Sequence, residues 1–462
     1  MSYNANGLVN ADGTVKEYGN TQGGSSGGGV GTQGTGHEAE VFNNEPADHA
    51  SGAWAHAEGQ GTSATEKCAH AEGESTVASG AHSHAEGYYT TASGSVSHAE
   101  GEHSTASGQY SHVEGEHSTA SGEASHAEGA LTSATAGYSH SEGYHTTASK
   151  ESSHSEGYRT IAGGEGSHTE GGNYVLNEQE QIAHDAIGKD IEVTEGEETV
   201  TYHIVGPYAK GLNSHAEGFQ NFAYGNDSHA EGHSTYAKGP HSHAEGESTM
   251  AFGVDAHAEG NVAKAIGNVS HAEGANTTAT GVCSHVEGSE TTANSFAAHA
   301  EGSACVAVAA MTHAEGEHTY AGAVCAHAEG SYTYAVGNNT HAEGANTTAY
   351  GANSHVGGDH SNTGESVNGF AHGEYIQLAE KNEVAFGKYN QPSTNAHPVC
   401  FSYGNGVDED HRENLFEITP TGINVKGTVT ADSFSNVIKS TTDLTPGTST
   451  LADGVIYLVY ED

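Results

Sequence analysis

Large apolar side chains are scarce in this sequence. Of its 462 residues only 34% are hydrophobic, with 10 Phe and a single Trp. A globular protein of this length would hold two or three domains with aliphatic cores, which this composition does not supply. No run of about 18 apolar residues occurs, so we expect no transmembrane helix. The first residues also lack the basic and apolar regions of a secretory signal peptide.

Positive charge and cysteine are scarce as well. Lys and Arg number 13 against 60 Asp and Glu, which gives a formal net charge of -47 with His neutral. Nucleic acid and anionic membranes attract basic surfaces, so this balance argues against both as partners. The cysteines form no CxxC motif, and we expect free thiols in a protein assembled in a reducing cytoplasm. They are Cys68, Cys283, Cys305, Cys325 and Cys400.

What the sequence has in abundance is one short repeat. A His followed two residues later by Glu recurs every fourteen residues in two series, and only the last copy, with Gly357, lacks the Glu. Disordered segments do not keep such a register, whereas solenoids do. The repeated histidines are His56, His70, His84, His98, His112, His126, His140, His154 and His168, then His215, His229, His243, His257, His271, His285, His299, His313, His327, His341 and His355.

Fourteen residues suit a coil of two short strands and two tight turns. In SHAEGYYTTASGSV, which begins at Ser83, a Gly follows each of the strands S-H-A-E and T-T-A-S. Side chains alternate along a strand, so Ala99 points into the narrow coil while His98 and Glu100 point out of it. We therefore predict an all-β chain, a parallel β-solenoid on which His and Glu form two columns. These outward His and Glu residues are called the His/Glu wall.

The wall predicts an oligomer. Glutamates stacked about 4.8 Å apart repel one another on a free surface, where such a pair would not need to recur in every coil. We expect three walls to meet on the three-fold axis of a homotrimer, where a His of one chain donates to a Glu of the next. The pairs expected there are His56 and Glu58, His70 and Glu72, His84 and Glu86, His98 and Glu100, His112 and Glu114, His126 and Glu128, His215 and Glu217, His229 and Glu231, His243 and Glu245, His271 and Glu273, His313 and Glu315, and His341 and Glu343.

The S-x-A-x-G strand and the fourteen-residue coil resemble the head repeat of trimeric autotransporter adhesins, whose signature is close to S-V-A-I-G. The resemblance covers roughly residues 50–172 and 212–390, and N-E-V-A-F-G at residues 382–387 is nearer to that signature. It implies a trimeric, left-handed parallel β-roll. In that roll His98 and Glu100 take the places of the apolar residues that line the family's trimer interface.

The wall also offers metal ligands. Histidines on a three-fold axis could form half of a transition-metal coordination shell, with Glu as the outer partner. The candidates for an axial metal are His98, His112, His271 and His285. We prefer a salt-bridge zipper, because each His and Glu satisfy each other without metal. Twenty copies of one environment do not resemble a catalytic pocket, so no catalytic residue and no cofactor is expected.

The composition changes along the chain. It predicts an N-terminal anchoring peptide with a Gly/Ser-rich linker, a first β-roll run, an inserted hairpin, a second β-roll run, a transition or neck, and a β-rich C-terminal tip. These segments are expected at residues 1–50, 51–172, 173–211, 212–358, 359–400 and 401–462, respectively.

The end of the chain suggests a virus particle. The stretch from His411 to Phe434 resembles the end regions of phage tail fibres, whose pattern is matched by Arg412, Asn414, Phe416, Gly422 and Gly427. The leading hypothesis is a phage or prophage tail fibre or receptor-binding protein without enzymatic activity. Its expected partners are two further copies of the chain, a phage tail or baseplate component bound by the N-terminus, and a bacterial surface receptor, with a glycan as one candidate.

Two alternatives stay open. One is a trimeric adhesin located on the bacterial cell surface instead of the virion. The other is a polysaccharide depolymerase carried on a fibre, for which the loose candidates are Asp408, Glu409 and Asp410.

Overall fold

The computed structural model describes residues 32–42, 49–172, 189–195, 198–204, 207–426, 437–440 and 456–459. It divides into two units, Met1–Ala321 and Gly322–Asp462. Every regular element among the described residues is a β-strand, which confirms the predicted all-β class. In this part of the chain no helix is long and apolar enough to cross a membrane. The five cysteines are free.

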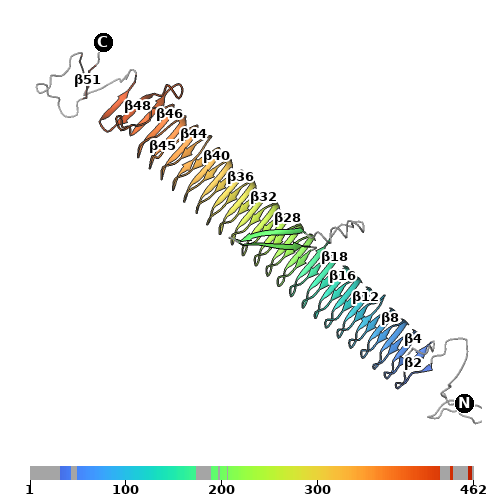
Figure 1. The fold of residues 1–462 in the computed structure, drawn as a ribbon. Coiled ribbons are helices and arrows are strands. Elements are labelled where there is room, and N and C mark those ends of the chain that lie inside the picture. Colours follow the sequence, from blue (N-terminus) through green and yellow to red (C-terminus); the bar gives the residue numbers. More distant parts are fainter. Residues whose placement is uncertain are drawn as a thin grey trace, which may run out of the picture. The chain divides into compact units, whose positions relative to one another are not determined.

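The first unit is a parallel β-solenoid whose coils stack in two sheets (Figure 1). Its first sheet carries the repeated histidines. The strands of this sheet are β2 (Glu40–Phe42), β4 (His56–Gln60), β6 (His70–Glu74), β8 (His84–Tyr88), β10 (His98–Ala99), β12 (His112–Glu116), β14 (His126–Ala130), β16 (His140–Tyr144), β18 (His154–Tyr158), β20 (His168–Gly171), β24 (His215–Phe219), β26 (His229–His233), β28 (His243–Glu247), β30 (His257–Asn261), β32 (His271–Ala275), β34 (His285–Ser289), β36 (His299–Ser303) and β38 (His313–Glu317), with β1 (Thr32–Gln33) antiparallel to β2.

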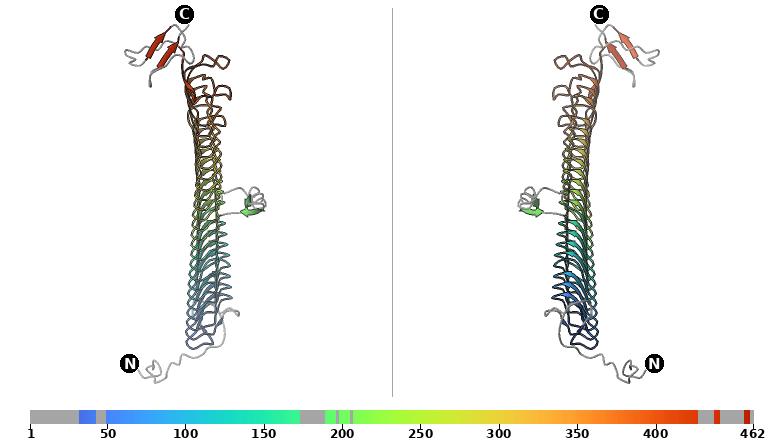
Figure 2. Two further views of the ribbon diagram at one scale, coloured as in Figure 1. Left: turned by 90° about the vertical axis from the view of Figure 1, so that its left-hand side faces the viewer. Right: turned by 90° about the vertical axis from the view of Figure 1, so that its right-hand side faces the viewer.

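The second sheet of the first unit consists of two-residue strands on the other side of the coil (Figure 2). Its strands are β3 (His49–Ala50), β5 (Ser63–Ala64), β7 (Val77–Ala78), β9 (Thr91–Ala92), β11 (Thr105–Ala106), β13 (Thr119–Ala120), β15 (Ser133–Ala134), β17 (Thr147–Ala148), β19 (Ile161–Ala162), β23 (Tyr208–Ala209), β25 (Phe222–Ala223), β27 (Tyr236–Ala237), β29 (Met250–Ala251), β31 (Lys264–Ala265), β33 (Thr278–Ala279), β35 (Thr292–Ala293), β37 (Val306–Ala307) and β39 (Tyr320–Ala321).

Register and core follow the fourteen-residue period. His98 pairs with His84 in the preceding coil and with His112 in the following coil. The fourteen-residue period therefore stacks each repeated histidine directly on the one before it. The interior is filled by alanine: Ala99 and its second-sheet counterpart Ala106 are completely buried. This small core confirms the predicted parallel solenoid and explains why a chain poor in large apolar residues folds.

Glycine is the usual residue at the two turns of a coil, where either a positive φ or the closeness of the next coil favours it. Gly87 has a φ of 107°, and a Cβ there would lie 2.2 Å from the carbonyl oxygen of Gly101 in the next coil. At the second turn Gly94 needs only the space, since a Cβ would lie 1.9 Å from the oxygen of Gly108. At Gly87 the positive φ and the close carbonyl oxygen both disfavour a side chain, whereas the place of Gly94 holds other residues in some coils, such as Lys150 and Ser295.

The strand boundaries differ from the sequence-based prediction. The first strand was expected to end before Gly87, but β8 continues through it to Tyr88. Gly87 pairs with the equivalent Gly73, because its positive φ bends the strand without breaking the ladder. The left-handed residue of this turn is Tyr89, with a φ of 54°.

The insert leaves the ladder intact. Strand β20 pairs directly with β24, and His168 lies opposite His215. The described part of the insert holds the antiparallel hairpin of β21 (Lys189–Glu195) and β22 (Glu198–Ile204). Most of the N-terminal anchoring peptide and the first part of the insert lie outside the described residues.

The second unit begins with the same coil. Its parallel strands are β40 (His327–Ser331), β42 (His341–Ala342), β44 (His355–Asp359), β45 (Phe370–Glu374), β46 (Val384–Lys388) and β47 (Phe401–Asn405), with β41 (Tyr334–Ala335) and β43 (Thr348–Ala349) in the opposite sheet. An antiparallel meander then joins β47 to β48 (Asn414–Thr419) and β49 (Gly422–Val425). Finally, β50 (Val437–Ser440) pairs in parallel with β51 (Ile456–Val459).

The parallel ladder does not stop at residue 358, where the second β-roll run was expected to end. Phe370, Val384 and Phe401 continue the column of His355 in register. The ladder continues because the next coils keep a small buried residue and a glycine at the same places, as in Val-Ala-Phe-Gly at 384–387. The residues expected as a neck at 359–400 therefore include solenoid coils.

Candidate functional site

Each residue of the His/Glu wall is held by the same local structure. In β10 the buried Ala99 fixes the strand face, so that His98 and Glu100 point away from the core. The His98 side chain is 37% exposed and the Glu100 side chain 33% exposed in the single chain. The wall is therefore half-buried by its own repetition, as each side chain lies between its copies in the coils on either side.

The imidazole rings of the first unit stack on one another. The ring centroids of His98 and His112 lie 4.8 Å apart with an interplanar angle of 6°, and those of His271 and His285 4.8 Å apart at 7°. Only the first pair departs, since the His70 ring meets His56 edge-on at 85°. The strand spacing imposes this geometry on the rings.

The Nε2 atoms of the stacked rings are buried but make no hydrogen bond within the described part of the chain. His98 Nε2 lies 3.8 Å from Glu100 Oε2, close enough for attraction when His98 is charged but too far for a hydrogen bond. The same holds along the unit. These nitrogens belong to His70, His84, His98, His112, His126, His140, His154, His168, His215, His229, His243, His257, His271, His285 and His299.

The glutamate column shares protons. Hydrogen bonds from the Glu114 and Glu86 carboxyl groups, with burial, raise the pKa of Glu100 to about 7. Conversely, the hydrogen bond to Glu100 lowers the pKa of Glu114. Farther along, the neighbours of Glu156 raise its pKa to about 7 in the same way. Stacked carboxylates therefore avoid full repulsion by holding protons near neutral pH.

The histidine column resists protonation. Burial, followed by repulsion from His215 and His243, lowers the pKa of His229 to about 4. The same two causes lower the pKa of six further wall histidines, so these rings are neutral at pH 7. They are His70, His98, His126, His154, His168 and His299.

The wall contains donor sets that a metal could use. His126, Glu128 and His140 bring three ligand atoms within 4.8 Å of one another, as do other triads of the same kind. Two nitrogens on one Zn²⁺ lie roughly 3.4 Å apart when each bond is about 2.0–2.1 Å. Parallel rings whose centroids stand 4.8 Å apart, such as those of His98 and His112, must tilt toward each other before both can bind.

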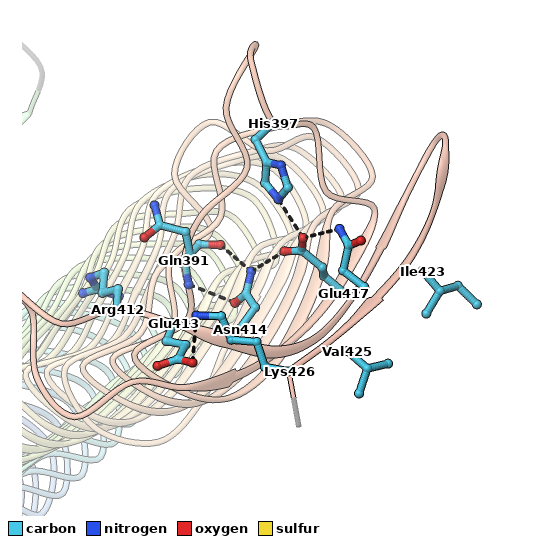
Figure 3. Close-up of a pocket in the computed structure, with 10 residues that line it drawn as sticks. Gln391, His397, Arg412, Glu413, Asn414, Glu417, Ile423, Val425 and Lys426 are labelled. Atoms are coloured by element: carbon cyan, nitrogen blue, oxygen red, sulfur yellow. Dashed lines mark hydrogen bonds and ion pairs between the residues drawn. The ribbon is translucent and has the colours of Figure 1, made fainter. Parts of the chain in front are cut away.

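A pocket of the second unit was missed by sequence reasoning. It has a volume of about 620 Å³, and its polar centre is the Glu417 carboxylate (Figure 3). Oε1 accepts from Asn424 at 2.8 Å and lies 2.7 Å from His397 Nε2, while Oε2 accepts from Asn414 at 3.1 Å. These donors lower the pKa of Glu417 despite its burial. His397 and Glu417 are twenty positions apart in the sequence, and no sequence motif indicated that they would pair.

The three acidic residues suggested for a depolymerase lie elsewhere. Asp408 Oδ1 accepts from the backbone N–H groups of Asp410 and His411 and lies 2.7 Å from His411 Nδ1, as expected of a turn-forming residue. None of the three, Glu409 included, lines the pocket of the second unit. The structure does not bring them together with another acidic group around this pocket.

Comparison with known families places the repeat. Five segments match the YadA head domain repeat (2 copies), at residues 71–97, 85–111, 99–123, 244–261 and 328–354. These matches and the fourteen-residue parallel coil confirm the resemblance to the head-repeat β-roll of trimeric autotransporter adhesins. They indicate an adhesin-like or fibre-like protein. A comparison with curated proteins finds no match.

Proposed function

We propose that this chain is the subunit of a homotrimeric adhesive fibre of the bacterial cell surface, which binds a surface receptor. In the trimer the His/Glu walls of three chains face one another along the three-fold axis. The YadA head repeats support the adhesive role, because the chain shares their coil and their S-x-A-x-G strand. The His/Glu wall occupies the face that is apolar in that signature.

The observation that carries this proposal is the row of buried Nε2 atoms without a hydrogen bond. A buried polar group that lacks a partner costs about 1–3 kcal/mol, and here the same group recurs in coil after coil. A second chain facing the wall supplies carboxylate oxygens to these nitrogens when the imidazole rings turn out of the stack, as His98 of one copy would toward Glu100 of another. Three-fold symmetry gives every chain the same partners.

Cysteine cross-linking tests the arrangement in the full-length chain. With the five native cysteines replaced by Ser, Glu100→Cys should form covalently linked dimers on mild oxidation, since the wall residues of neighbouring subunits meet at the axis. Ser93→Cys is the matched control, because Ser93 is exposed on the opposite sheet. Sedimentation of the unmodified protein should give a trimer. A monomer at neutral pH, or equal cross-linking of both variants, would refute the proposal.

The adhesive role has its own test. Display of the chain on a non-adherent bacterium should cause attachment to receptor-bearing surfaces, and Ala99→Leu, which disrupts a coil, should abolish it. Attachment that is unchanged by this variant, or absent from the wild type, would count against an adhesin even if the protein is trimeric.

A phage tail fibre is the second candidate. It is favoured by the resemblance of the β48–β49 region, through Arg412, Asn414 and Phe416, to tail-fibre end regions. Arg412 donates to the carbonyl oxygen of Tyr375 at 2.7 Å, which makes it part of the second unit's framework. Detection of the chain in purified virions by mass spectrometry would establish this candidate; its presence on intact, non-lysogenic cells would establish the adhesin.

A further inference from the structure

The His/Glu wall contains one defect, and it lies in the second unit. The glutamate column runs from Glu329 to Glu343, but the next coil has Gly357 and the one after it His372. The histidine column still holds His355 beside this gap. The defect therefore brings a His into the glutamate column, one coil beyond a missing side chain.

Side chains from three coils converge on the gap. Glu343 Oε1 lies 3.2 Å from His355 Nε2 and 3.7 Å from His372 Nδ1. A Cβ on Gly357 would stand 2.4 Å from His372 Nδ1 and 2.7 Å from Glu343 Oε1, so any other residue would displace one of them. The φ of Gly357 is outside the left-handed region, so the backbone does not require glycine here. Space for these two side chains is what the glycine provides.

We propose that Glu343, His355 and His372 form a binding site for one divalent transition-metal ion of the Zn²⁺ class. Two imidazole nitrogens and one carboxylate oxygen are a common donor set for such ions. Their separations of 3.2 and 3.7 Å bracket the roughly 3.4 Å expected between two ligands of one Zn²⁺. The site is half-exposed, which leaves room for water as a fourth ligand.

The ring orientation at this site differs from that of the stacked rings in the wall. The rings of His341 and His355 are inclined by 46°, whereas rings such as those of His98 and His112 in the first unit are parallel within 6°. With this tilt His355 Nε2 lies 3.2 Å from Glu343 Oε1, whereas the stacked His341 ring has its Nε2 3.7 Å from Glu329 Oε1. All three ligands come from one chain, so the site does not depend on the proposed trimer.

The test is Zn²⁺ binding by the full-length protein, measured by isothermal titration calorimetry and by anomalous diffraction at the zinc edge. The wild type should bind one tight Zn²⁺ per chain, with the anomalous peak between Glu343 and His372. Gly357→Glu, which restores the residue found in the other coils, should weaken this site by more than about 100-fold, as expected when ligands are displaced.

Two variants separate ligation from folding. His372→Phe introduces the residue that Phe386 provides at the same place in the next coil, so it should fold normally and lose the tight Zn²⁺. His49→Ala removes an exposed histidine of β3, outside the His/Glu wall, and should leave that ion bound. Equal Zn²⁺ affinity and stoichiometry in the wild type and Gly357→Glu would overturn the proposal, as would an anomalous peak elsewhere on the wall.

Discussion

Two coils of this protein, one from each unit, have the same frame and different walls. Ala99 and Ala385 are both completely buried, and the glycines two residues after them, Gly101 and Gly387, have φ angles of 100° and 95°. On either side of the buried alanine the first coil has His98 and Glu100, whereas the second has Val384 and Phe386. The coil therefore needs a small buried residue and a glycine but folds with either wall. The choice of His and Glu must serve something other than the fold of one chain.

The two walls differ in how their charge responds to pH. Phe370 and Phe386 pack with tilted rings 5.4 Å apart and carry no charge at any pH. The His/Glu wall instead holds groups with displaced pKa values, such as His229 at about 4 and Glu100 at about 7. The charge of an interface built from the apolar wall is the same at every pH. The charge of an interface built from the His/Glu wall changes with pH.

The largest effect is expected from the frame that both coils share. Ala99→Leu and Ala385→Leu each force a large side chain into a completely buried position, where overpacking costs about 1–3 kcal/mol or more. Both variants should lower the midpoint of chemical denaturation by similar amounts. Glu100→Gln is the control and should have little effect on the folding of the coil. A tolerated Leu in one unit only would show that the two frames are not equivalent.

The second prediction exchanges the walls. In four consecutive coils, His84, His98, His112 and His126 become Val and the paired glutamates become Phe, as in the coil of Val384. The variant should keep its parallel solenoid, seen as an unchanged circular dichroism spectrum, and lose the part of the pH dependence of its thermal midpoint that His98, His126 and Glu100 contribute. A collapse of the solenoid would show that the His/Glu wall is needed for folding after all.

The direction of the pH effect follows from the displaced pKa values. Wall histidines such as His229 and His98 have folded pKa values below 6.5, so their contribution to stability is complete above pH 6.5 and is lost as the pH falls toward 4. Glu100 and Glu156, at about 7, act oppositely: their contribution is complete below pH 4.5 and is lost as the pH rises through 7. Because more histidines than glutamates are displaced, the wild type should melt at a lower temperature at pH 5 than at pH 7.

The sequence predicted the frame because the frame is periodic. Alternation around His98 was sufficient to place Ala99 inside and Glu100 outside, and the structure agrees. The convergence at Gly357 was not predictable, because it depends on two side chains reaching across the space of a missing one. The strand that continues through Gly87 was missed because a positive φ there is compatible with both a turn and a bent strand.

The smallest effect concerns the turn that precedes each wall strand. Val96 adopts a φ of 58°, which costs a residue with a Cβ about 1–2 kcal/mol and suits Asn better. In the second unit the same place holds Asn339, Asn353, Asn368 and Asn382, whose amides donate to one another at 3.0, 3.1 and 2.8 Å.

Val96→Asn should therefore raise the free energy of unfolding by up to about 1 kcal/mol, measured by urea denaturation, because it relieves the strained turn without a neighbouring amide. Val96→Asn combined with Tyr110→Asn should gain more than the sum of the two single variants, since the second Asn lies one coil away and completes a hydrogen bond. Asn353→Val in the second unit is the reciprocal change. It should lose both the favourable backbone conformation and the amide hydrogen bonds to the neighbouring coils. If the double variant is only additive, the amide ladder of the second unit does not stabilise its turns, and the asparagines there are explained by backbone conformation alone.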